Sequence, residues 1–375
     1  MIIPRQRTRG FTLVELLVVI SIITILASSL LFAMMEAQQQ AKANRTRAQI
    51  AKIHTILIGK WERYRSRPLP LRLPNMAPNQ LAATRLLALR ETMRMELPDR
   101  ITDVVDPPTL PLLSSPSTRN AYLRRSTTTW TPQFQSSECL YLILATTRDG
   151  ETSALDYFRE NEVGDLDNDG MREILDGWGN PILFLRWAPG FSSHPGPDGG
   201  WGNVNVDDDG DGIDDDAGEA GWPSSDDITI SQIQSRNSEK SGDPMDPRRV
   251  DPRWRDANTS FDPFALYPLV FSAGEDKEYG IYVEDGYSPP DLRNVDNRTA
   301  PISGNPPLFR YSQTALPAPI GAWPSDPYAA AADYTQLDFA LGTPFRFDIR
   351  TNSTSVTTLD SADNINNHLL EVRTD

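Results

Sequence analysis

The sequence predicts an α+β protein in which a long N-terminal spine helix, membrane-spanning in its first half, packs on a small antiparallel sheet with long acidic loop insertions. Three features predict this fold. An apolar run covers 11–35, an apolar stripe with helical spacing follows it as far as the prolines at 68 and 70, and strand-like runs beside turn residues occur at 182–185 and 267–271.

Composition excludes several classes of function. The chain has 375 residues and a formal net charge of -15, which disfavours nucleic acid as the main partner. Cys139 is the one cysteine, so no intrachain disulfide and no cysteine-based zinc or iron–sulfur site is possible. We expect Cys139 to be a buried packing residue.

The apolar run at 11–35 is long enough to cross a bilayer. As a helix it would reach about 37 Å, against a hydrocarbon core of about 30 Å. It contains no Lys or Arg and is longer than the apolar stretch of a secretory signal peptide. Basic residues lie close on both sides, so charge leaves the orientation open.

Glu15 lies inside this apolar run, where a carboxylate costs about 2.5–3.5 kcal/mol at mid-membrane and less near the interface. Two interpretations remain open. The side chain could extend to the headgroups, or it could pair with a cation. A cut after Gly10 would create such a cation on the amino group of Phe11, either in the same helix or in a neighbouring subunit.

The stretch at 9–20, RGFTLVELLVVI, resembles the class III leader and N-terminal helix of type IV pilins and type II secretion pseudopilins. The resemblance implies cleavage by prepilin peptidase after Gly10, methylation of the Phe11 amine, and a role for Glu15 in assembly with other pilin or pseudopilin subunits. It also implies a single pass through the inner (cytoplasmic) membrane with a periplasmic body. The proline found partway along many pilin helices is missing here.

The helix is expected to continue beyond the membrane to about residue 67, a total of roughly 85 Å. The prolines at 68 and 70 end it, because proline removes a backbone donor and clashes with the preceding turn. The second half is amphipathic and needs a globular partner. Its apolar stripe comprises Ile50, Ile53, Leu57, Trp61 and Tyr64.

The region 68–160 is expected to be helical and proline-rich. A loop at 69–78 leads to a helix at 79–96, whose apolar face comprises Leu81, Leu86, Leu89 and Met93. The segment 106–116 is expected to be extended, and 136–146 to be either a helix or a buried strand. No catalytic spacing occurs here or elsewhere, so we do not expect an enzyme.

Two acidic stretches predict calcium binding. The first, at 165–176, follows the register of a twelve-residue calcium loop, with Gly170 at the sharp turn and Asp in place of the final bidentate Glu. The second, at 205–216, resembles the Asp-rich repeats of thrombospondin type 3 or dockerin segments. The alternatives are a solvated acidic turn and a weakly structured metal-free segment. The candidate ligands are Asp165, Asp167, Asp169, Glu173 and Asp176 in the first stretch, and Asp207, Asp209, Asp211, Asp214 and Asp215 in the second.

The stretches 176–181 (DGWGNP) and 272–276 (SAGED) resemble the end of the major type II secretion pseudopilin, in which a C-terminal loop holds calcium. That resemblance implies Ser272 and Asp276 as candidate calcium ligands. Gly177 stands where the family has proline, and Lys277 where a glycine is common. The insertion at 189–263, which contains the second acidic stretch, lies outside the family pattern.

The expected organisation is a leader at 1–10, a transmembrane and assembly helix at 11–35, its amphipathic continuation at 36–67, the helical region at 68–160, a β region at 161–286 and a proline-rich and polar extension at 287–375. The extension is expected to hold an edge strand at 345–349 and a short helix at 360–372. The function predicted from the resemblance is a pilin-like structural subunit, a pseudopilin of a type II secretion or related filament system rather than a surface pilus subunit. The alternative is a membrane-anchored calcium-binding or adhesive module that does not polymerise.

Overall fold

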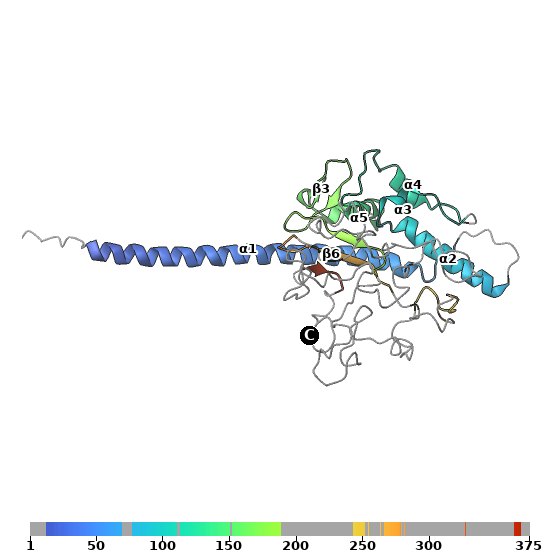
Figure 1. Cartoon of the computed structure of the whole chain (residues 1–375), viewed down its shortest axis with the longest axis horizontal. Helices are drawn as coiled ribbons and strands as arrows, with labels where there is room; N and C mark the ends of the chain where they lie inside the picture. The colour runs from blue at the N-terminus through green and yellow to red at the C-terminus, as the bar shows by residue number, and fades with distance from the viewer. Residues whose placement is uncertain are drawn as a thin grey trace, which may run out of the picture.

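The computed structural model describes residues 13–69, 77–110, 113–150, 152–188, 243–251, 254, 263, 266–277, 279, 281, 327 and 364–368. A long helix, α1, enters a globular head with its C-terminal half and leaves its N-terminal half projecting from it (Figure 1). Helices α2 to α5 and the small sheets make up the described part of the head.

Helix α1 spans Leu13–Arg63, which corresponds to about 76 Å at the standard helical rise. The continuous helix predicted from the sequence is confirmed, and it ends a few residues earlier than expected, in a turn in which Tyr64 N donates to the Trp61 carbonyl at 3.1 Å. The predicted apolar stripe is also confirmed, because its five residues are all buried in the main core of the head.

Four further helices follow, α2 (Pro78–Glu96), α3 (Ile101–Val105), α4 (Ser117–Leu123) and α5 (Gln135–Thr146). The helix predicted at 79–96 is confirmed, but Leu81 is exposed, so the buried face begins at Leu86. Helix α5 decides between the two expectations for 136–146 in favour of a helix. Cys139 on this helix is completely buried, as expected of a packing residue.

The strands are short and antiparallel throughout the described residues. The strands predicted at 182–185 and 267–271 are confirmed, and the structure pairs them directly, with Phe184 opposite Val270. They form a three-stranded sheet in the order β5-β6-β7. The elements are β1 (Arg148–Asp149), β2 (Thr152–Ser153), η1 (Ala154–Tyr157), η2 (Glu160–Glu162), β3 (Val163–Gly164), β4 (Glu173–Ile174), β5 (Leu183–Leu185), β6 (Leu269–Ser272) and β7 (Ile365–Asn366).

Both faces of the three-stranded sheet are buried. Phe184 and Val270 lie on the face that packs in the main core, together with residues of α1 and α5. Leu185 and Phe271 lie on the opposite face and pack with Tyr279 in a second apolar cluster. Burial on both faces explains why these strands are continuous apolar runs rather than alternating ones.

The helix expected at 360–372 is wrong for the described residues 364–368, which contain strand β7. Asn367 anchors this segment: its Oδ1 accepts from Val270 N at 2.7 Å, and its Nδ2 donates to the Pro268 carbonyl at 2.9 Å. Pairing with β6 therefore outweighs the local helical preference. The edge strand expected at 345–349 lies outside the described residues.

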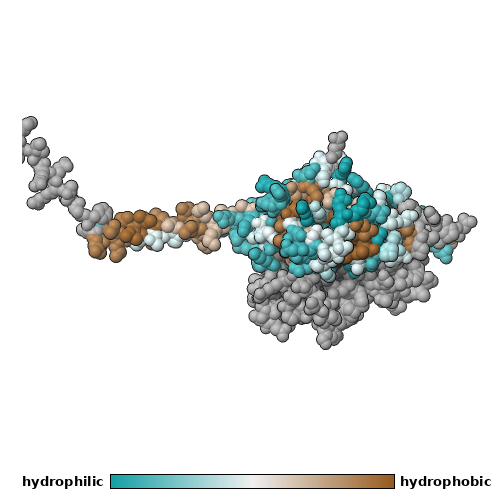
Figure 2. Space-filling view, turned by 90° about the horizontal axis from the view of Figure 1, so that it is seen from above, coloured by the Kyte–Doolittle hydropathy of each residue, from teal (hydrophilic) through white to brown (hydrophobic). Residues whose placement is uncertain are grey.

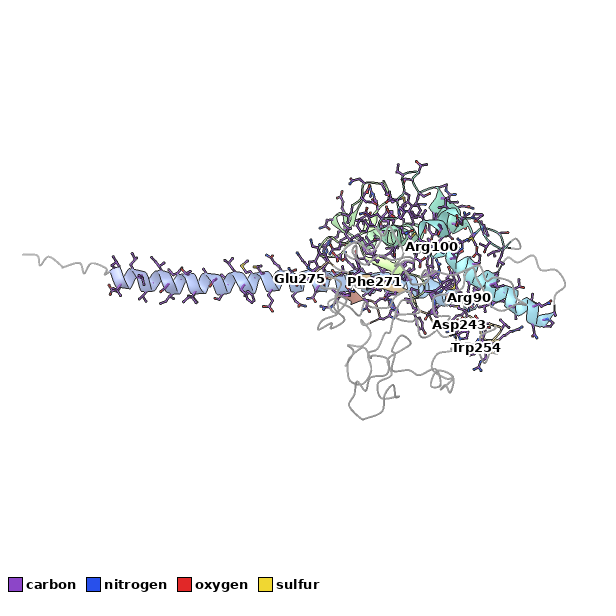
Figure 3. The ribbon with its side chains drawn as sticks, viewed as in Figure 1. Arg90, Arg100, Asp243, Trp254, Phe271 and Glu275 are labelled. Carbon is purple, nitrogen blue, oxygen red and sulfur yellow. The ribbon has the colours of Figure 1, made fainter. Side chains whose placement is uncertain are left out.

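Buried ion pairs connect the helices to the rest of the head. Arg90 of α2 donates to the carboxylates of Asp243 and Asp251, both at 3.0 Å, and Arg90 and Asp243 lie close together in Figure 3. Arg186, directly after β5, contacts Asp103 of α3 at 2.9 Å. These pairs fix α2 and α3 to segments that are distant in sequence.

Candidate functional site

The N-terminal half of α1 presents an apolar surface that the head does not cover (Figure 2). Its large apolar side chains between Leu13 and Met35 are 42–79% exposed. An exposed apolar surface of this extent marks a membrane-facing or protein-binding surface. By length and composition α1 is able to cross a membrane.

The polar groups of this half are compatible with lipid. The hydroxyls of Ser21, Thr24, Ser28 and Ser29 each donate to a backbone carbonyl one turn earlier, at 2.8–2.9 Å. Their hydrogen bonds are therefore made within the helix, as a bilayer requires. Glu15 lies exposed in the first turn of α1. Gly10 and Phe11 lie outside the described residues.

The turn at 176–181 docks on α1 immediately beyond the apolar half. Gly177 N donates to Thr46 Oγ1 at 2.9 Å, and Trp178 Nε1 donates to Gln39 Oε1 at 2.8 Å. A Cβ at position 177 would lie 2.5 Å from the carbonyl oxygen of Lys42, so only glycine allows this approach. The turn thus fixes the angle at which the spine leaves the head.

Asp176 shapes this turn. Its carboxylate accepts from Trp178 N at 2.8 Å, from Asn180 N at 2.9 Å and from Ser272 Oγ at 2.6 Å. Ser272 is fully buried, whereas Asp276 is exposed. The structure therefore brings Asp176 and Ser272 together, and it gives Asp276 a different environment from Ser272.

The first acidic stretch forms a cluster between β3 and β4. One carboxylate oxygen from each of Asp165, Asp167 and Asp169 lies within 4.8 Å of the others. A second group, closed by a residue of α5, contains Glu138, Asp167 and Glu173 within the same distance. The predicted ligands Asp165, Asp167, Asp169 and Glu173 are thus brought together, and Asp176 is not among them.

Burial raises the pKa of the two glutamates in this cluster. Burial, together with the neighbouring acidic groups, raises the pKa of Glu138 to about 10. Burial likewise raises the pKa of Glu173 to about 8. The candidate ligands of the second stretch, Asp207, Asp209, Asp211, Asp214 and Asp215, lie outside the described residues.

Comparison with known proteins adds one finding. A family model described as the prokaryotic N-terminal methylation motif matches residues 5–31. No curated protein and no solved structure matches the chain.

The motif and the exposed half of α1 coincide, and together they support a type IV pilin-like precursor. Such a leader implies processing by a peptidase and assembly with pilin subunits, and it is typical of structural, non-enzymatic subunits. One long apolar N-terminal helix behind this leader fits a single-pass, membrane-anchored protein.

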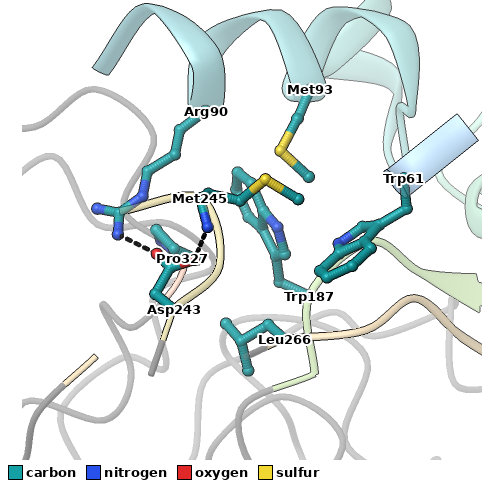
Figure 4. Close-up of a pocket in the computed structure, with 8 residues that line it drawn as sticks. All are labelled: Trp61, Arg90, Met93, Trp187, Asp243, Met245, Leu266 and Pro327. Atoms are coloured by element: carbon teal, nitrogen blue, oxygen red, sulfur yellow. Dashed lines mark hydrogen bonds and ion pairs between the residues drawn. The ribbon is translucent and has the colours of Figure 1, made fainter. Parts of the chain in front are cut away.

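A small pocket lies where α1, α2 and the strands meet (Figure 4). Its lining includes Trp61, Met93 and Trp187, with the Arg90–Asp243 ion pair at one side. Its cavity volume of about 10 Å³ is at the lower limit for a single water molecule. We interpret it as a packing junction rather than a substrate site.

Sequence reasoning missed Glu138 and the residues of α1 that receive the turn. Glu138 had a visible signal, because it is the only charged residue in the apolar segment 136–146. Thr46 and Gln39 had no comparable signal. They are polar residues of a helix, and the sequence alone does not show which distant loop contacts them.

Proposed function

We propose that this chain is a structural pilin-like subunit, processed by prepilin peptidase after Gly10, methylated on Phe11 and assembled through α1. We further propose that it is a pseudopilin of a type II secretion or related filament system. It would sit in the inner membrane with its head on the periplasmic side and have other pilin or pseudopilin subunits as partners.

The observation that carries this proposal is the uncovered apolar half of α1, most of which lies within the methylation motif at residues 5–31. A membrane anchor alone needs only an apolar helix. Glu15 lies in the first turn of α1, and placing a carboxylate in an apolar membrane helix costs free energy. Interactions made on assembly would offset this cost. A neighbouring subunit's cleaved amino group would place a positive charge beside Glu15 and fix the axial stagger between helices.

The pseudopilin assignment is supported by the turn at 176–181. This turn leads into β5, and β6 ends at Ser272, so both stretches that resemble the major pseudopilin flank the same sheet. The departure at Gly177 has a local explanation, since any Cβ there would meet the Lys42 carbonyl. Glycine at position 177 therefore allows this turn to contact the spine directly.

Two substitutions separate processing from assembly. Gly10→Ala is expected to leave the leader attached, as seen by intact mass. Glu15→Ala is expected to yield processed protein that stays out of the high-molecular-mass fraction after mild detergent extraction. Glu36→Ala is the matched control, because Glu36 is an exposed glutamate of the same helix beyond the apolar half.

The non-polymerising anchor makes the opposite prediction. If wild-type protein runs as a monomer when other pilin or pseudopilin subunits are co-expressed, or if Glu15→Ala assembles as well as Glu36→Ala, then the assembly role of Glu15 is wrong.

A further inference from the structure

We propose that Glu138, Asp167 and Glu173 bind one calcium ion, with Asp165 completing the site, and that this ion ties α5 to the loop between β3 and β4. This inference stands independently of the assembly role of α1. It differs from the loop predicted from the sequence in two ligands, because Glu138 of α5 takes the place of Asp176 and Asp169 is not a ligand.

The spacing of the oxygens suits the ion. Calcium binds oxygen ligands at about 2.3–2.6 Å, so two ligands of one ion are about 3.4 Å apart at a right angle and about 4.8 Å apart when opposite. The oxygens of Glu138, Asp167 and Glu173 all lie within 4.8 Å of one another. They are therefore already close enough to share one ion.

The strongest evidence is a pair of buried oxygens without partners. Glu138 and Glu173 are both completely buried, and Oε1 of each has no hydrogen-bond partner among the described residues. Their other oxygens are held, since Glu138 Oε2 accepts from Trp130 Nε1 and Glu173 Oε2 accepts from Leu166 N at 3.1 Å. Buried oxygens left open in this way are costly unless something binds them.

The main charged neighbours of Glu138 and Glu173 are acidic. In the described part of the head, the electrostatic neighbours that shift Glu138 and Glu173 most are other carboxylates, Asp167 among them. Elsewhere in the head, buried carboxylates such as Asp103 and Asp243 are paired with arginines. A divalent cation would neutralise the carboxylates of the cluster, as Arg186 does for Asp103 and Arg90 does for Asp243.

The carboxylate of Asp176 already accepts hydrogen bonds that shape the turn at 176–181. The donors are Trp178 N, Asn180 N and Ser272 Oγ, with a longer bond from Asn180 Nδ2 at 3.5 Å. The loop instead packs toward α5 through Thr131, whose hydroxyl donates to Asp167 at 2.8 Å and whose N donates to Asp169 at 2.6 Å. This contact brings Glu138, seven residues further along, to the cluster.

The test uses the full chain in detergent, stripped with EGTA and titrated with calcium chloride. At a calcium concentration of 100 Kd the melting temperature should rise by about 5–10 °C. Glu138→Gln keeps an acceptor for Trp130 while removing the charge, and it should raise Kd at least tenfold and abolish the shift. The double variant Asp207→Asn/Asp209→Asn, in the second acidic stretch, should retain the shift.

Terbium gives a local readout, because Trp130 contacts Glu138 and should sensitise emission from an ion bound beside it. Trp130→Phe should lower that emission several-fold. Trp201 and Trp222 flank the second stretch in sequence, so an unchanged signal in Trp130→Phe would place the ion elsewhere and overturn the proposal.

Two further results would overturn it: an equal melting temperature of the wild type with calcium and with EGTA, or wild-type affinity in Glu138→Gln. An equal shift with magnesium would refute the choice of ion. If Glu138→Gln fails to fold, Asp165→Asn replaces it, since Asp165 is exposed and its substitution leaves the core intact. It should raise Kd in the same direction, and unchanged affinity would again contradict the site.

Discussion

Gly177→Ala should destabilise the head by forcing the turn away from the spine. The added Cβ would lie 2.5 Å from the Lys42 carbonyl oxygen, whereas ordinary contact begins at 3.4 Å, so one partner must move by about 0.9 Å. Overpacking of this kind costs about 1–3 kcal/mol. The same movement weakens the hydrogen bonds to Thr46 and Gln39, each with a net value of about 0.5–1.5 kcal/mol.

The expected loss in the free energy of unfolding is thus about 2–6 kcal/mol. Urea unfolding of the full chain in detergent, followed by tryptophan fluorescence, measures it. Gly59→Ala is the matched control, because a Cβ there meets nothing within 4 Å. It should stabilise the helix by about 0.5–1 kcal/mol. Equal stability of Gly177→Ala and wild type would refute the close approach of turn and spine.

Two further substitutions test the interior of the head. Burial lowers the pKa of Lys60 from 10.5 to about 8, so the folded state releases its proton first and stability should rise with pH between those values. Lys60→Met should abolish that rise and add about 1–3 kcal/mol at pH 7, and parallel pH profiles of the two proteins would contradict this. Arg90→Met removes the guanidinium from buried Asp243 and Asp251 and should cost about 3–5 kcal/mol in urea unfolding. Exposed Arg124→Met should change stability by less than about 0.5 kcal/mol, and a similar loss in both variants would argue against the ion pair.

The spine could be predicted because its information is local. Ile50, Ile53, Leu57 and Trp61 recur at helical spacing, and that spacing alone determines which face of α1 is buried. Strands β5 and β6 were also accessible, since both are continuous apolar runs bounded by turn residues. The sequence pattern that predicts each of these elements lies within the element itself and does not depend on contacts with distant segments.

The remaining features depend on contacts between segments distant in sequence. Strand β7 has two residues, and it is held by the Asn367 side chain rather than by its own strand propensity. The acidic cluster shows the same limit. Spacing identified Asp165, Asp167, Asp169 and Glu173, but the choice between Asp176 and Glu138 is made by the packing of α5 against the loop.

The intact mass of the protein isolated from membranes tests most directly whether the chain is a processed pilin-like subunit. Cleavage after Gly10 and methylation should give a chain that begins at Phe11, with residues 1–10 removed and one methyl group added to the new amino terminus. A mature protein that still carries Met1, or one that begins at Phe11 without the methyl group, would contradict this prediction.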